Sequence, residues 1–238
     1  MSDGFPNKPK ILRGAFVEFG LSLPPLVVVF QFNPLQLSRN RSLSFAVPNP
    51  PAAPPGTKAV AVPTRTLRQF HGQFSDLLDL QKQQLVIAQE QTIGFDIRLD
   101  ASDKLNEGDA ITEQFGIAPQ ISTLELMVYP KDESLLGAAL GALLGGPKGF
   151  SFTRGSNPPL ILFIFGRKRV LPVNINSMNI TETEFSADLN PIRATVGVSL
   201  TVIEGKSVPY MYSKAMTEAM SILNLANISS IANVVVPG

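Results

Sequence analysis

The stretch from Leu160 to Glu204 constrains the fold most, because it consists of strand-forming segments joined by polar turns. Residues 160–165 form a continuous apolar run that predicts one buried strand, and the glycine and basic residues after it predict a turn. Residues 170–178 and 192–203 alternate in polarity, which predicts half-buried antiparallel strands. This stretch indicates an architecture but no chemistry, so its function has to be inferred from assembly.

Further strands are predicted in the first hundred residues. Residues 11–19, 26–32 and 35–47 are rich in strand-forming residues, and Asn33-Pro34 ends the second of these runs, because proline lacks an amide donor. Residues 92–100 alternate Ile, Phe, Ile and Leu with polar neighbours, which is a strand pattern. Residues 67–91 are polar and glutamine-rich, and their central part fits either a helix or a mobile loop.

Two helices are predicted beside these strands. Apolar residues recur at helical spacing between Pro119 and Tyr129, with proline in the first turn and Pro130 as the stop. Residues 212–236 also place apolar side chains near one helical face. The fold class predicted is therefore mainly β, a barrel of two packed antiparallel sheets with a flanking helix and a C-terminal helical tail.

The predicted domain division has one β domain, residues 1–204, followed by a helical docking tail, residues 205–238. Two loops interrupt the β domain. The proline-rich segment 48–63 cannot pair in a sheet, and the Gly/Ala/Leu-rich segment 134–150 repeats small residues every four positions but is too short to span a bilayer.

Composition excludes several function classes. The chain carries 20 basic and 19 acidic side chains, so no extended positive field exists to gather nucleic acid or an anionic membrane. Only 16% of residues are charged whereas 44% are hydrophobic, a balance that favours a surface partly covered by partner subunits. The N-terminus lacks the layout of a signal peptide, and no segment is long and apolar enough to span a membrane, so we expect a cytoplasmic protein.

The inventory of reactive groups is short. Cysteine is absent and His71 is the only histidine, so thiolate chemistry and His/Cys zinc sites are excluded. Carboxylates cluster between Asp96 and Asp109, but without the spacing of an EF-hand loop. The glycine-rich run 141–148 lacks the Lys-Ser/Thr pair of a phosphate-binding loop. We therefore predict no catalytic, cofactor-binding or metal-binding residues and no cofactor.

Four segments resemble the tube-type proteins of contractile injection systems, the phage-tail-like machines of bacteria. They are residues 29–34 (Val-Phe-Gln-Phe-Asn-Pro), residues 95–101 (Phe-Asp-Ile-Arg-Leu-Asp-Ala), and residues 162–167 with 180–204. In the last block, residues 184–194 are similar to the long turn into the family's final strand. The order and spacing of these segments cover most of residues 10–204.

The resemblance implies a six-membered ring, and the class it fits best is the baseplate adaptor that lies between the spike hub and the first ring of the inner tube. Relatives of that class often end in a LysM module, for which about thirty residues after Gly205 are too few. The partners implied are further copies of the chain, the spike hub, inner-tube subunits and other baseplate components, with no nucleic acid and no membrane span.

Residues expected at partner interfaces lie in the segments that resemble the family, in the basic turn and in the glycine-rich loop. They are Phe32, Asn33, Pro34, Leu136, Gly137, Gly141, Arg167, Lys168, Arg169, Asn190, Pro191 and Arg193. Two alternatives stay open: the inner-tube subunit itself, and a free β-rich binding or hydrolytic domain that uses the acids between Asp96 and Asp109.

Overall fold

The computed structural model describes residues 12–20, 26–48, 65–129 and 157–224 of the chain. The chain divides into two compact units, residues 1–39 with 92–238, and residues 40–91. We call them the sheet unit and the ribbon unit. The boundary predicted after residue 204 is a different division and stays a prediction.

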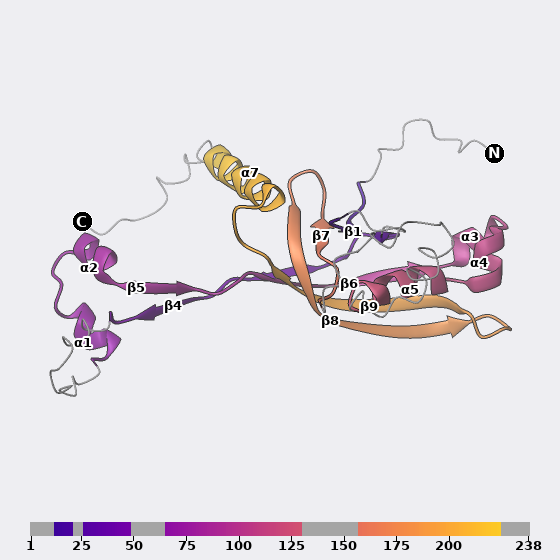
Figure 1. The fold of residues 1–238 in the computed structure, drawn as a ribbon, viewed down its shortest axis with the longest axis horizontal. Coiled ribbons are helices and arrows are strands. Elements are labelled where there is room, and N and C mark those ends of the chain that lie inside the picture. The colour runs from indigo at the N-terminus through magenta and orange to yellow at the C-terminus, as the bar shows by residue number, and fades with distance from the viewer. Residues whose placement is uncertain (1–11, 21–25, 49–64, 130–156, 225–238) are drawn as a thin grey trace, which may run out of the picture. The chain divides into compact units, whose positions relative to one another are not determined.

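The sheet unit is built on a seven-stranded sheet with the order β2-β1-β7-β8-β9-β6-β3 (Figure 1). The strands are β1 (Ala15–Glu18), β2 (Val27–Val29), β3 (Leu37–Asn40), β6 (Thr92–Asp100), β7 (Ile161–Ile164), β8 (Val170–Phe185) and β9 (Pro191–Val202). Pairing is antiparallel in each strand pair of known register, with Phe16 opposite Phe163 and Ile97 opposite Val196. The sequence prediction of a mainly β, antiparallel fold is therefore confirmed.

The sheet curls strongly around its core. Phe95 of β6 and Phe163 of β7 have ring centroids 5.1 Å apart, although β8 and β9 separate their strands. In a flat sheet three strand spacings would put roughly 14 Å between them. Phe16 and Phe30 complete this aromatic cluster.

The sheet does not close into a barrel, which corrects the prediction. Among the described strands β2 and β3 form the two edges, and the second sheet consists only of β4 (Leu43–Ala46) and β5 (Leu85–Ala88), in the ribbon unit. The predicted strand 35–47 is thus two strands, β3 and β4. They separate at Arg41-Ser42 because β3 belongs to the large sheet and β4 pairs with β5.

The alternating patterns predicted the core correctly. On β6 the side chains of Ile93, Phe95, Ile97 and Leu99 are all buried. On β9 the same holds for every second residue, Ala194, Val196, Val198, Leu200 and Val202. Because residues alternate between the faces of a strand, the opposite face of both strands carries the more polar residues.

Helices of the sheet unit follow the sequence in part. The predicted helix 119–129 is α5 (Ala118–Leu126), which buries Ile121 and Leu124 and has proline in its first turn. Two short helices, α3 (Ser102–Asn106) and α4 (Ala110–Phe115), follow β6 and were not predicted from the sequence. The tail helix is α7 (Val208–Asn224), which begins before the predicted residue 212.

In the ribbon unit, the segment 67–91, whose central part fits either a helix or a mobile loop by sequence, contains two helices and a strand. They are α1 (Leu67–His71), α2 (Leu77–Gln83) and β5. Thr66 and Gln69 form a capping box at the start of α1, and the Asp76 carboxylate accepts from the Leu78 backbone N–H at the start of α2. Both helices are therefore specified by local polar signals.

Candidate interaction surfaces

The β4–β5 ribbon exposes large apolar side chains on both of its faces. Leu43, Phe45, Leu85, Val86 and Ile87 are each between 46% and 52% exposed. Phe45 lies opposite Val86, and Ser44 lies opposite Ile87. Paired residues share a face and neighbours alternate, so Phe45 and Val86 lie on one face and Ile87 lies on the other.

The ribbon unit has little core to support this ribbon. Among its described residues, Phe70 is the only buried apolar side chain, and its ring contacts that of Phe74 at 5.0 Å. A two-stranded ribbon is marginally stable in water unless another element covers a face. Among the described residues, the ribbon is thus an exposed apolar surface with little core beneath it.

The strand pattern of β4 and β5 gave a signal that the sequence prediction missed. Leu43 and Phe45 alternate with serines, and residues 85–87 form an apolar run just after a helix. The sequence prediction places them in the strand 35–47 and in the segment 67–91, and it does not pair the two.

The predicted interface residues at 32–34 lie just after the edge strand β2. Phe32 is exposed, as are Val27 and Val29 on β2. The Asn33 side chain fixes the segment that precedes β1 in the same chain. Its Oδ1 accepts from the Gly14 N–H at 2.9 Å, and its Nδ2 donates to the Leu12 carbonyl at 2.8 Å. Asn33 therefore shapes this edge, with Pro34 half-buried after it.

The basic turn between β7 and β8 lies against α7. The Tyr212 hydroxyl donates to the Arg167 carbonyl at 2.8 Å, and Lys168 Nζ lies 3.1 Å from the sulfur of Met220. The guanidinium of Arg169 lies over the Phe165 ring at 5.9 Å. Burial and the neighbouring charge of Arg39 lower the pKa of Arg169.

Asn190, Pro191 and Arg193 make contacts inside the chain. Asn190 Nδ2 donates to the Gln114 carbonyl at 2.8 Å, and the Pro191 carbonyl accepts from the Ile117 N–H at 2.8 Å. Arg193 Nε donates to Asp100 Oδ2 at 2.8 Å, and its Nη1 pairs with Glu184. These residues join the β8–β9 hairpin tip to the helical segment, a role that sequence did not predict.

Leu136, Gly137 and Gly141 lie outside the described residues, as do residues 49–63 of the proline-rich loop and the whole of the loop 134–150. Their assignment to interfaces stays a prediction.

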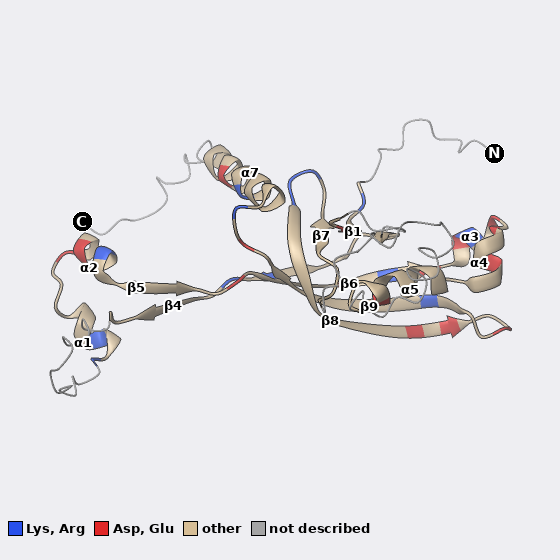
Figure 2. Cartoon of the chain, viewed as in Figure 1, with Lys and Arg blue, Asp and Glu red and all other residues tan. Residues whose placement is uncertain are grey.

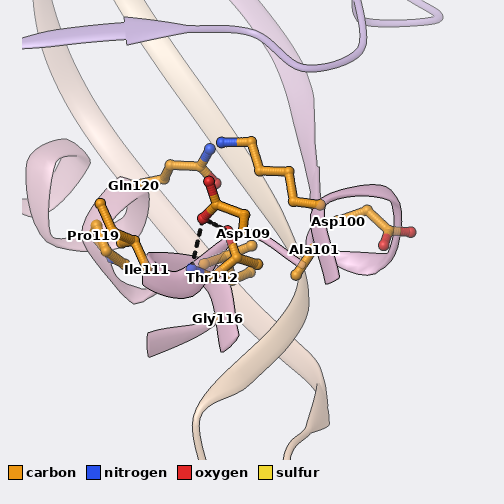
Figure 3. Close-up of a pocket in the computed structure, with 10 residues that line it drawn as sticks. Asp100, Ala101, Asp109, Ile111, Thr112, Gly116, Pro119 and Gln120 are labelled. Carbon is orange, nitrogen blue, oxygen red and sulfur yellow. Dashed lines mark hydrogen bonds between the residues drawn. The ribbon is translucent and has the colours of Figure 1, made fainter. Parts of the chain in front are cut away.

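Two of the acids proposed for an alternative hydrolytic role, Asp100 and Asp109, line a small cavity of about 130 Å³ (Figure 3). Asp109 accepts hydrogen bonds from the hydroxyl and the backbone N–H of Thr112, which lower the pKa of its carboxyl. Asp100 accepts from the Ser102 N–H and from Arg193. Small-molecule sites usually occupy about 300–1,000 Å³, so this cavity is small for a substrate. Both carboxylates also accept a backbone N–H from the first turn of a helix, Asp100 from α3 and Asp109 from α4.

Across the described ranges, no group of three or more His, Asp or Glu side chains is arranged to hold a metal ion. Nor does any helix within them have the length and apolar character needed to cross a membrane.

Similarity to known proteins adds nothing to this picture. No protein-family model matches the chain, and no curated protein sequence matches it.

Proposed function

We propose that this protein is a structural adaptor in the baseplate of a bacterial contractile injection system. In this role six copies form a ring that joins the spike hub to the inner tube, assembled in the bacterial cytoplasm with other baseplate components. The observation that carries the proposal is the β4–β5 ribbon, which exposes Phe45 and Val86 on one face and Ile87 on the other. The resemblance in residues 29–34, 95–101, 162–167 and 180–204 supplies the kind of assembly.

An exposed apolar ribbon supports an assembly component because a free subunit would carry it as an aggregation hazard. The large sheet adds a second reason, since β2 and β3 are its edges among the described strands. Sheet edges offer unpaired backbone groups that a neighbouring subunit can cover. Closed cyclic symmetry covers such surfaces in every copy at once.

The inner-tube subunit is the alternative role for the same surfaces. It differs in copy number, because an adaptor ring is present once per particle whereas tube rings repeat along the length. Quantitative mass spectrometry of sedimented native particles measures this directly. We expect a fixed number near six, and copies that scale with particle length would make the chain the tube. Absence from the particles would contradict both roles.

A ribbon deletion tests the surface that carries the proposal. The Gln89 N–H donates to the Ser42 carbonyl at 2.9 Å, so the chain can close between these residues. We would replace residues 43–88 by Asn-Gly, which favours a two-residue hairpin turn. The sheet unit should keep its thermal unfolding transition, because its core lies outside the deleted segment. The variant should be missing from particles, and normal incorporation would overturn the role of the ribbon.

A further inference from the structure

The sheet unit carries opposite charges at the two ends of one strand. β8 runs for 16 residues from Val170 to Phe185, which corresponds to roughly 50 Å of extended chain. Figure 2 shows basic residues in the turn before β8 and acidic residues near its far end and on α3 and α4. The whole chain has a formal net charge of only +1, so the separation is one of position within a nearly neutral molecule.

The acidic end consists of residues 100–117 and 182–193. Together they hold eight carboxylates against two cations, Lys104 and Arg193. The two segments form one surface, because Asn190 donates to the Gln114 carbonyl and Arg193 pairs with both Asp100 and Glu184.

The basic end consists of residues 166–170, residues 203–218 and Arg39. These hold six cations against two carboxylates, Glu204 and Glu218. The Ser213 hydroxyl accepts from the Val170 N–H and donates to its carbonyl, both at 2.8 Å, so α7 is attached to the start of β8. Arg39 is close enough to Arg169 for its charge to contribute, after burial, to the lowered pKa of Arg169.

Each end also exposes apolar side chains beside its charges. At the acidic end Ile111 and Leu189 are 64% and 79% exposed. At the basic end Val208 and Met211 of α7 are 81% and 48% exposed. Protein interfaces commonly combine an apolar centre with a polar rim, and both ends have this composition.

We propose that the acidic end of one copy docks on the basic end of a second copy of this chain. Charge complementarity selects this occupant, because the chain itself supplies both surfaces. A contact between two different surfaces of identical chains is head-to-tail and forms a ring when the rotation closes. The inference rests on the proposed ring and names the surfaces through which its subunits meet.

Two charge-reversed variants test the contact. The acid-reversed variant carries Glu107→Lys, Glu113→Lys, Glu182→Lys and Asp188→Lys, which change the formal net charge of the acidic end from −6 to +2. The base-reversed variant carries Arg167→Glu, Lys168→Glu and Lys214→Glu. Apart from the contact of Lys168 with Met220, no bond described above involves these side chains, so both variants should unfold at the wild-type temperature.

Self-association would be measured by sedimentation velocity on the full chain. Wild type should associate at about 0.1 M salt and dissociate at about 1 M. The added salt screens the charges, because it shortens the Debye length from roughly 10 Å to roughly 3 Å. Each variant alone presents like charges at both ends, so its association should weaken by more than about tenfold. An equal mixture of the two variants should associate again, because each reversed end then meets its complement.

A matched control carries Arg65→Glu, Arg68→Glu and Lys82→Glu, which change the net charge as much as the base-reversed variant but lie in the ribbon unit. It should associate like wild type, and its failure to do so would overturn the proposal. The proposal would also be overturned if wild type stayed monomeric at low salt or if the mixture of the two variants stayed monomeric. If the mixture stayed monomeric and one variant entered particles poorly, the reversed end of that variant would be assigned to contact with a different protein.

The outcome for the proposed function is separate. Restored association of the mixture with absence of the chain from sedimented particles would support the contact and contradict the adaptor role. Normal uptake of either reversed variant alone would contradict the contact and leave the adaptor role standing.

Discussion

The sheet unit and the ribbon unit use similar apolar residues for opposite purposes. In the sheet unit Phe16 and Phe163 are fully buried in an aromatic cluster around which the sheet curls. In the ribbon unit Phe45 and Ile87 are about half exposed on a two-stranded ribbon. Burial of an apolar side chain stabilises the fold by roughly 1.5–3 kcal/mol. Among the described residues, the apolar side chains of the ribbon realise only part of this stabilisation.

The largest effect should come from the core of the sheet unit. Phe163→Ala removes a ring that contacts Phe16, Phe95 and Phe165, and should lower the free energy of unfolding by about 3–5 kcal/mol. Phe45→Ala is the matched change on the ribbon and should cost much less in the free subunit while weakening uptake into particles. Urea unfolding measures the first effect. Equal stability losses in both variants would break the distinction between the two units.

A glycine in each unit sharpens the comparison at the level of the backbone. Gly116 has a φ of +58°, and a Cβ there would lie 2.1 Å from the Pro191 carbonyl oxygen. Gly116→Ala should therefore cost at least about 1–3 kcal/mol, since it combines backbone strain with a clash. Gly72 in the ribbon unit has a φ of −68°, and a Cβ there would lie 3.5 Å from the nearest atom, the Arg68 carbonyl oxygen. Gly72→Ala should leave the thermal unfolding transition almost unchanged, and a loss equal to that of Gly116→Ala would contradict this account.

A smaller effect is expected where α7 joins the sheet. Ser213→Ala removes both hydrogen bonds to Val170 at a buried position and should cost about 1–3 kcal/mol. Ser44→Ala on the exposed ribbon should be nearly neutral in the free chain. Hydrogen exchange of the Val170 amide measures the first change locally, and unchanged protection in Ser213→Ala would show that other contacts hold the helix.

The smallest effect is electrostatic and confined to acid pH. The Ser102 hydroxyl and N–H and the Arg193 guanidinium hold the pKa of Asp100 below its ordinary value of 3.8. Because the folded pKa is lowered, this stabilisation is present above pH 3.8 and is lost as the pH falls through the folded pKa. The residue is partly exposed, so Asp100→Asn should cost less than about 1 kcal/mol at neutral pH.

The check is a pair of unfolding curves, at pH 7 and near pH 2. The difference between wild type and Asp100→Asn should shrink at the lower pH, because more of the wild-type carboxyl is then protonated and neutral like the Asn side chain. A difference that stays constant with pH would assign the effect to hydrogen-bond geometry. Asp79→Asn in the ribbon unit, where the carboxylate pairs with exposed Lys82, should change stability even less.

Local patterns predicted much of the sheet but less of the candidate surfaces. The strand 92–100 was predicted with the bounds it has, because one of its faces is buried along its whole length. The interface assignment of Asn190, Pro191 and Arg193 did not anticipate their internal bonds to Gln114, Ile117 and Asp100, since these join residues far apart in sequence. The ribbon was not predicted because β4 and β5 are separated by about forty residues, and the local pattern of one strand does not indicate which strand it pairs with.

The sequence by itself determined which segments form strands and which of their faces are apolar, because alternation and helix caps act over a few residues. It also excluded chemistry that depends on cysteine or on several histidines. Only the tertiary structure decided that the sheet stays open, that Phe45 and Ile87 remain exposed, and that opposite charges gather at the two ends of β8. These properties depend on strand pairing and side-chain contacts between distant residues, which no local pattern specifies.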